Sequence, residues 1–197
     1  MAELTEAVAA RIAAMPGGAV FFSGAFSDLC PAYRIGRILT ALEGDGLVRR
    51  RGRGIYSKPF GSGSASLHPT LPQLVEALAL RYGVRVVPTG RTAAALLGLC
   101  RADPSVSTYL TSGTSRSFIL DGTNVVLRRG RERRFRYQTR LAPLVEQALL
   151  YLGPDHVGPA ELSALKAAID KNAEKETFPA DVPLMPAWMK RALLPIL

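Results

Sequence analysis

Four arginines lie close together near residue 50, and their chemistry suits a phosphate backbone. Guanidinium groups form charge-assisted hydrogen bonds with phosphate oxygens, and the glycines at 52 and 54 let a loop approach a duplex closely. Each phosphate that is neutralised adds about 0.9 to the slope of log affinity against log salt concentration. The sequence therefore predicts mainly sequence-independent DNA contacts by Arg49, Arg50, Arg51 and Arg53.

A helix directly precedes these arginines and has a polar face of its own. Apolar residues from Ile35 to Leu42 follow the i, i+3, i+4, i+7 spacing of an amphipathic helix. A helix with one buried face fits the major groove, where its outward side chains reach base edges. Arg34 lies on the flank, where pairing with an acidic residue is the alternative to a DNA contact. The expected DNA-contacting residues of this helix are Tyr33, Arg34, Arg37 and Thr40.

The elements that position these residues follow a recognisable order. Apolar spacing predicts a first helix over residues 4–15, and a brief strand then leads to a short helix near Ser27. Behind the polar helix, strands over residues 47–51 and 55–58 join as a hairpin. This order predicts a winged helix-turn-helix domain over residues 1–60, in which the hairpin is the wing.

A second domain is expected after a stretch rich in glycine, serine and proline. Residues 61–72 have the composition of a linker. Strands then alternate around a hairpin turn at Asp121-Gly122, and the chain is helical from about residue 141. The predicted fold class is α+β, with an N-terminal winged helix-turn-helix and a mixed α/β C-terminal domain over residues 73–197. Its helical tail, which contains Trp188, is expected to dock on its own core, with partner binding as the alternative.

The start of the helix in "TGRTAAALLGL" could bind phosphate or could simply be capped by a threonine. A glycine-initiated helix can bind phosphate at its N-terminus. The stretch lacks the Lys-Ser/Thr pair of a P-loop and the spacing of a dinucleotide fingerprint. We therefore favour a structural role, in which Thr89 or Thr92 caps the helix.

A second arginine cluster follows the strands of the C-terminal domain. Phe135 and Tyr137 are interleaved with it, and aromatic rings among arginines can stack on bases. Alternation in "FRYQT" equally suits a strand with one buried face, and an acidic protein is the competing partner. The second arginine cluster, a second candidate basic surface, consists of Arg128, Arg129, Arg131, Arg133, Arg134 and Arg136.

Overall composition favours a folded protein with a polyanionic partner. The 197 residues are 48% hydrophobic, and 25 Lys+Arg against 16 Asp+Glu give a net charge of +9. Cys30 and Cys100 lie far apart without CxxC spacing, which favours two reduced thiols over a zinc site. We find no leader pattern and no apolar run of about 18 residues, so we expect a cytoplasmic protein.

Catalytic residues are hard to assemble from this sequence. His68 lies in the expected linker and His156 in a Gly-Pro loop, and neither belongs to an HExxH, GxSxG or paired-carboxylate pattern. Two histidines are too few for a multi-histidine metal centre. We expect a protein that is not an enzyme and requires neither a metal nor another cofactor.

Four segments, in order along the chain, carry a family resemblance: "FFSGAFSDL", "YRIGRILTALEGDGLVRRRGRGIYSKP", "LVEALALRYGVRVVPTGRTAAALLGL" and "YLTSGTSRSFILDGTNVVLRR". Together they resemble the AbiEi-like antitoxins of type IV toxin-antitoxin systems, over about Val20 to Arg129. The resemblance implies a bacterial autorepressor that binds double-stranded operator DNA through its winged helix. It also implies a C-terminal domain that opposes a nucleotidyltransferase-like toxin. The alternative is a winged-helix module that binds protein or RNA without recognising an operator.

Overall fold

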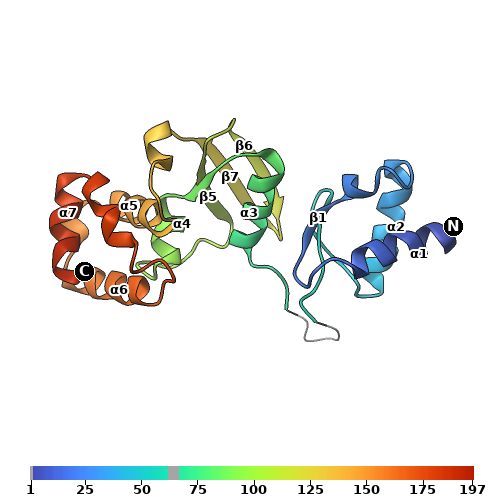
Figure 1. Cartoon of the computed structure of the whole chain (residues 1–197), viewed down its shortest axis with the longest axis horizontal. Helices are drawn as coiled ribbons and strands as arrows, with labels where there is room; N and C mark the ends of the chain where they lie inside the picture. Colours follow the sequence, from blue (N-terminus) through green and yellow to red (C-terminus); the bar gives the residue numbers. More distant parts are fainter. Residues whose placement is uncertain (1, 62–66) are drawn as a thin grey trace. The chain divides into compact units, whose positions relative to one another are not determined.

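The computed structural model describes residues 2–61 and 67–197, and contacts divide the chain into two units (Figure 1). The first unit runs to Tyr82 and includes the segment Ile119–Gly122; the second contains the remaining residues. The fold is α+β, as the sequence predicts. The stretch expected to be a linker is described only in part, because residues 62–66 lie outside the described residues.

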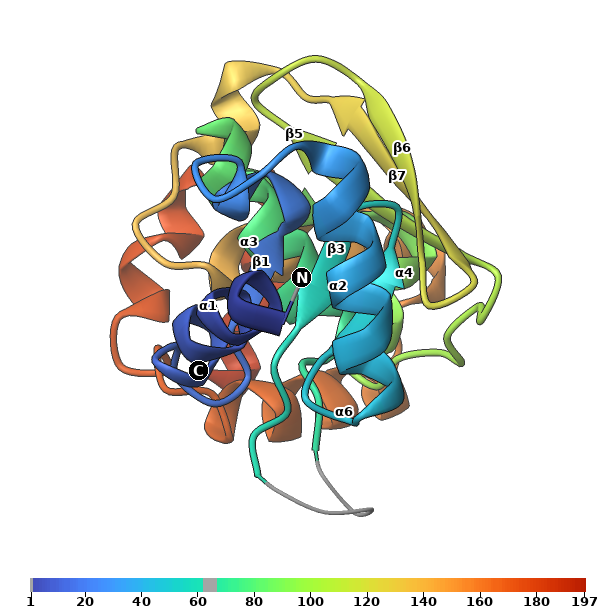
Figure 2. The same cartoon turned by 90° about the vertical axis from the view of Figure 1, so that its right-hand side faces the viewer.

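The first unit has the element order of a winged helix (Figure 2). Strand β3 lies between β1 and β2 and is antiparallel to both. The wing is the β2–β3 hairpin. The elements are α1 (Ala2–Ala13), β1 (Val20–Phe22), α2 (Ala32–Gly44), β2 (Arg49–Gly52), β3 (Ile55–Ser57) and α3 (Leu71–Tyr82).

Two local predictions differ from the structure of this unit. The short second helix is a 3-10 helix at Ser23–Phe26, for which Ser27 is the C-terminal cap residue. Strand β2 begins at Arg49, two residues later than predicted. The reason is the end of α2, where Gly46 has a φ of 73° and the Leu47 amide donates to the Leu42 carbonyl over 3.0 Å. Leu47 thus completes a glycine-based helix cap and does not start the strand.

The apolar stripe of α2 packs into the core of the first unit. Ile35, Ile38, Leu39 and Leu42 are all buried there, together with side chains of α1. Tyr56 of β3 stacks on Phe21 of β1, with ring centroids 6.0 Å apart. The core therefore fixes α2 and the wing on one framework and leaves the opposite face of α2 to solvent.

Helix α3 groups with the first unit by its contacts. It packs against β1, and the guanidinium of Arg81 lies 4.7 Å from the ring centroid of Phe22. The sequence-based division places this helix in residues 73–197. Leu74, Val75 and Leu78 of α3 are buried, and its contacts with β1 assign the helix to the first unit.

The second unit combines a mixed sheet with helices. The sheet order is β4-β5-β7-β6; β5 is parallel to β7 and antiparallel to β4. The last two residues of β6 belong to the first unit by contacts. The elements are β4 (Val86–Pro88), α4 (Gly90–Leu96), β5 (Val106–Thr111), β6 (Arg116–Leu120), β7 (Thr123–Arg129), α5 (Leu141–Leu152), α6 (Pro159–Asp170) and α7 (Ala187–Leu193).

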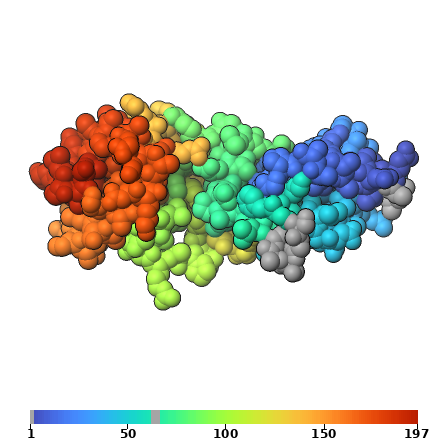
Figure 3. Space-filling model, turned by 60° about the horizontal axis from the view of Figure 1, so that its bottom comes forward, coloured from blue at the N-terminus to red at the C-terminus, as the bar shows by residue number. Residues whose placement is uncertain are grey.

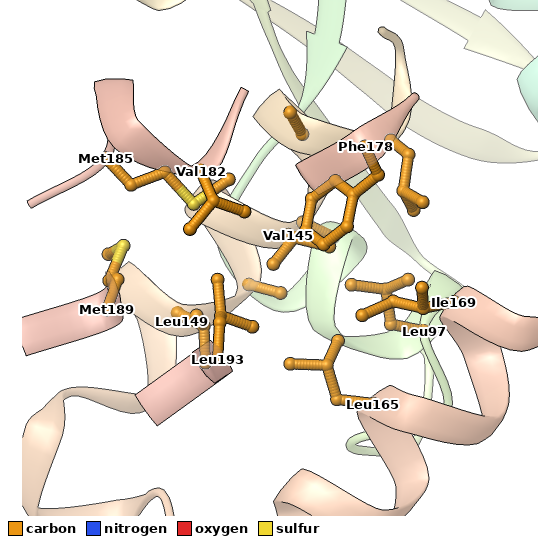
Figure 4. Close-up of a cluster of buried hydrophobic side chains, with 14 of the residues drawn as sticks. Leu97, Val145, Leu149, Leu165, Ile169, Phe178, Val182, Met185, Met189 and Leu193 are labelled. Atoms are coloured by element: carbon orange, nitrogen blue, oxygen red, sulfur yellow. The ribbon is translucent and has the colours of Figure 1, made fainter. Parts of the chain in front are cut away.

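The helical tail docks on the core of the second unit, as expected. Met189 and Leu193 of α7 are fully buried among side chains from α5, α6 and the turns before α7 (Figure 4). Trp188 is partly buried against the same cluster. The apolar face of the tail is therefore occupied within this unit.

The expected threonine cap of α4 is wrong. Thr89 precedes the helix, but its hydroxyl donates to Oε1 of Gln147 on α5 over 2.6 Å. The Thr92 hydroxyl accepts from the Thr108 amide of β5 over 2.8 Å. Both threonines therefore connect α4 to its neighbours, because longer-range partners outcompete the local backbone amides.

Candidate nucleic-acid interface

The solvent-facing side of α2 presents the side chains that the sequence predicts. Tyr33 is 66% exposed, and Arg37 and Thr40 are also exposed. The Thr40 hydroxyl donates to the Gly36 carbonyl over 2.9 Å, which leaves its oxygen free to accept a hydrogen bond. This face therefore offers a ring, a guanidinium and a hydroxyl on successive turns of one helix.

Arg34 contacts Tyr33, and no acidic side chain among residues 2–61 and 67–197 forms an ion pair with it. Its Nε donates to the Tyr33 hydroxyl over 3.1 Å, and its guanidinium lies 5.8 Å from the centroid of the Tyr33 ring. Both side chains are exposed. The pair extends the polar face of α2 at the N-terminal end of the helix.

The wing presents three of its four arginines to solvent. Arg49, Arg50 and Arg53 are exposed, and the last lies in the turn between β2 and β3. The Arg50 amide donates to Oε1 of Glu43 over 2.7 Å, which connects the wing to the end of α2. Glu43 thus has a positioning role that the sequence does not reveal, since an acid at a helix end is ordinarily a solvated residue.

The helix face and the wing meet at an open hollow of about 470 Å³. Figure 3 is a space-filling view of one face of the whole chain, in which the first unit is blue to cyan. Apart from its chain neighbours and the backbone of its own helix, no described atom lies within 4 Å of the position that a Cβ on Gly36 would take. A glycine inside a helix costs about 1 kcal/mol relative to alanine, so Gly36 is a sequence signal of this hollow. The hollow is lined by Tyr33, Gly36, Arg37, Thr40, Arg50 and Tyr56.

Arg51 does not join this interface, contrary to the expected phosphate contact. It is only 6% exposed, and its Nε lies 2.9 Å from each carboxylate oxygen of Asp121. Its Nη2 also donates to Asp121 and, over 2.8 Å, to the Pro69 carbonyl. Successive side chains of a strand point to opposite faces, so Arg51 points inward when Arg50 points outward.

His68 lies near the inner side of the wing. Burial lowers the pKa of His68 from its usual 6.5, and the positive charges of Arg49 and Arg51 act in the same direction. Its Nδ1 is buried, and no described residue hydrogen-bonds it. These surroundings favour a neutral imidazole.

The second arginine cluster divides into exposed and internally bound members. Arg134 Nη1 lies 2.8 Å from Oε1 of Glu146, whose side chain is buried. Arg136 donates to the Leu184 carbonyl. Those two guanidiniums therefore have partners within the second unit. Arg134 is partly buried, whereas Arg136 stays exposed although it has this partner. The other exposed members are Arg128, Arg129, Arg131 and Arg133.

The aromatic residues of this cluster are not placed for stacking on bases. Phe135 is buried, and the Arg85 guanidinium covers its ring at 5.2 Å from the centroid. Tyr137 is partly buried, and burial together with the Glu146 charge raises the pKa of Tyr137 to about 12. The segment is a 3-10 turn at Glu132–Phe135 followed by irregular chain, so the alternative of a strand is wrong.

The described chain shows no metal site. No group of three or more His, Cys, Asp or Glu side chains within residues 2–61 and 67–197 is arranged to hold a metal ion. Both cysteines are free thiols. In the part of the chain that the structure describes, no helix has the length and apolar character to cross a membrane.

Comparison with known proteins gives a family without an assigned activity. No curated protein matches the chain in sequence. A family model described as a family of unknown function, DUF6088, matches residues 7–177, which is most of the chain. The chain belongs to the DUF6088 family of unknown function.

Proposed function

We propose that this chain is a DNA-binding transcriptional repressor, whose first unit binds double-stranded operator DNA through α2 and the wing. The observation that carries the proposal is the shared hollow. Side chains expected to read bases, Arg37 and Thr40, line it together with Arg50, which is expected to bind phosphate. Independent sequence signals thus meet at one surface of a winged helix.

The interface residues suit different parts of a duplex. Arg37 has the planar fork that binds O6 and N7 of guanine, and Thr40 offers a hydroxyl to either kind of base-edge group. Arg49, Arg50 and Arg53 are exposed cations on a short hairpin, which suits contacts with phosphates on the backbone. In this account α2 supplies sequence specificity, and the wing supplies salt-dependent affinity.

We also propose that the chain is an antitoxin that counters a nucleotidyltransferase-like toxin. The support is the resemblance of Val20 to Arg129 to AbiEi-like antitoxins, a span that includes the wing, α3 and the sheet of the second unit. Under this proposal the protein represses its own operon in the cytoplasm and acts by binding, without catalysis.

A two-part cellular experiment tests both roles. A reporter gene is placed behind the DNA upstream of this chain's own gene, and growth is followed beside a neighbouring nucleotidyltransferase-like gene. The wild-type chain should repress the reporter and rescue growth. A variant with Arg49, Arg50 and Arg53 replaced by Ala should lose repression and keep the rescue.

Each half of the experiment has its own contradicting result. A reporter that the wild-type chain leaves fully active would contradict the repressor proposal and favour a protein- or RNA-binding module. Growth that no version of the chain restores would contradict the antitoxin proposal and leave a DNA-binding regulator.

A further inference from the structure

A four-residue segment that is distant in sequence belongs to the same unit as the wing. The segment Ile119–Gly122, here called the clasp, forms the end of β6 and the turn into β7. The Asp121 amide donates to the Arg51 carbonyl over 2.9 Å, and the Asp121 carboxylate accepts the hydrogen bonds from Arg51 described above. Backbone and side chain therefore hold the clasp to the same wing residue.

The clasp also approaches the wing too closely for any other residue than glycine at position 52. A Cβ on Gly52 would lie 2.7 Å from the Ile119 carbonyl oxygen and 3.1 Å from Cδ2 of Leu120. The φ of Gly52 is not positive, so the requirement comes from the neighbour and not from the backbone conformation. The register of β2 against β3 shifts between Arg50 and Gly52, at the place of this close approach.

The turn geometry explains how Asp121 reaches Arg51. Asp121 has a φ of 48° and Gly122 a φ of 80°, which is the conformation of a two-residue Asp-Gly hairpin turn. Among the described residues, Asp121 is the only non-glycine residue with a positive φ. Aspartate tolerates this conformation better than most residues, and here it also supplies the carboxylate.

We propose that Asp121 and Gly52 are positioning residues for DNA binding, because they hold the clasp on β2 and so fix the directions of the exposed wing arginines. This inference rests on the proposed DNA-binding function. A wing that is fixed before binding loses less conformational entropy on the duplex than a mobile one. The DNA-binding unit then requires residues far beyond Tyr82.

The first test compares two aspartates in the full chain. Asp121→Asn keeps the side-chain shape and the tolerance for positive φ but removes the charge. Asp28→Asn is the matched control, because Asp28 pairs with Arg11 over 2.7 and 2.8 Å, on an exposed part of the same unit. Both variants change the net charge equally, so their general electrostatic effects on DNA binding match.

Asp121→Asn should weaken binding to a duplex about tenfold, whereas Asp28→Asn should stay within about twofold of the wild type. The stoichiometry at saturating DNA should remain that of the wild type, because positioning acts on folded molecules and partial unfolding removes binding sites. Equal affinities of the two variants would overturn the inference. Tighter binding by Asp121→Asn would also overturn it, since Arg51 would then be a phosphate ligand that Asp121 masks.

A second pair of variants separates packing from charge. Gly52→Ala pushes the clasp away without altering any charge. Gly44→Ala is the control, because a Cβ there lies within 4 Å of no described atom other than its chain neighbours and the backbone of its own helix. Gly52→Ala should also weaken DNA binding about tenfold, and Gly44→Ala should not. Wild-type affinity in Gly52→Ala would contradict the positioning role.

Hydrogen exchange without DNA distinguishes failure of this inference from failure of the proposed function. Peptides that cover Arg49–Ser57 should exchange faster in Asp121→Asn and Gly52→Ala than in either control. If the wild type binds no duplex but these peptides do exchange faster, the clasp does hold the wing in place and the proposed DNA-binding function is wrong. Unchanged exchange in both variants would contradict the inference that the clasp fixes the wing.

Discussion

Two arginine-rich regions of this chain look alike in sequence and differ in their surroundings. In the wing, Arg50 lines a hollow with Arg37 and Thr40 of α2. In the second arginine cluster, Arg134 and Arg136 are held by Glu146 and the Leu184 carbonyl. Arginine content alone therefore does not distinguish the two regions; what differs is that Arg50 is exposed beside other polar side chains of α2.

The same contrast exists between neighbours within the wing. Arg50 is exposed, whereas Arg51 is buried with its guanidinium bound to Asp121 and Pro69. One step in the register of a strand therefore separates a candidate DNA ligand from a structural ion pair.

The largest expected effect is the loss of stability in Arg51→Ala. Removing Arg51 leaves the Asp121 carboxylate without its partner in an ion pair that is mostly buried. Because the Asp121 side chain is partly exposed to solvent, the cost should be roughly 2 to 4 kcal/mol. Urea unfolding measures it. Arg50→Ala is the control and should change the free energy of unfolding by less than about 0.5 kcal/mol. Equal stabilities of the two variants would remove the contrast between these neighbours.

The next effect concerns DNA affinity. Replacing Arg49, Arg50 and Arg53 with Ala should weaken binding to any duplex by roughly a hundredfold and lower the salt slope by about 3. The control replaces Arg128, Arg131 and Arg133 of the second arginine cluster, which removes the same charge from exposed positions. The control should change affinity much less. A titration in which both triple variants lose affinity equally would show that only net charge matters.

Specificity should depend on a single arginine of α2. Arg37→Ala should cost about 1 to 3 kcal/mol on the operator and leave binding to random DNA nearly unchanged, because a base contact favours one sequence. Competition titrations with both duplexes measure the difference. Equal losses on the two duplexes would mean that Arg37 contacts phosphate.

A smaller effect is expected from filling the hollow. Gly36→Ala should raise the free energy of unfolding by about 0.5 to 1 kcal/mol, because alanine favours the helix and the added methyl meets no described side chain or other element within 4 Å. The same methyl enters the hollow and should weaken operator binding. Thermal melts should show the gain in stability, and DNA titrations should show the loss of affinity. Tighter DNA binding would mean that the duplex does not occupy the hollow.

The smallest effect is a pH dependence from His68. Its folded-state pKa is lowered, so the unfolded chain binds more protons near the usual value of 6.5. Stability therefore rises with pH and is lost as pH falls below about 6.5. His68→Gln should reduce this slope in urea unfolding series across that range. If the slope of the free energy of unfolding against pH is unchanged in His68→Gln, the pH dependence comes from other titratable groups.

Sequence periodicity predicts much of the fold because the relevant interactions are local. The apolar stripe from Ile35 to Leu42, the Asp121-Gly122 turn and the helical tail are all present as expected. Helix ends and strand starts are less predictable, as Leu47 shows, because a helix cap and a strand compete for the same residue.

The exposed residues of the candidate site are most predictable on α2, where exposure follows from helical periodicity. The outward positions of α2 follow from the 3.6-residue repeat. The inward position of Arg51 does not, because it depends on Asp121, 70 residues away in sequence. Phe135 is a similar case, since burial under Arg85 removes a ring that the sequence offers for stacking.

The most direct test of the central claim is a DNA titration of the full-length chain at several salt concentrations. One duplex carries the sequence upstream of the chain's own gene, and the other is a scrambled duplex of the same length and composition. The account predicts that the upstream duplex binds at least about 10³-fold more tightly, with affinity that falls steeply as salt rises. Equal affinity for both duplexes, or binding that is insensitive to salt, would contradict it.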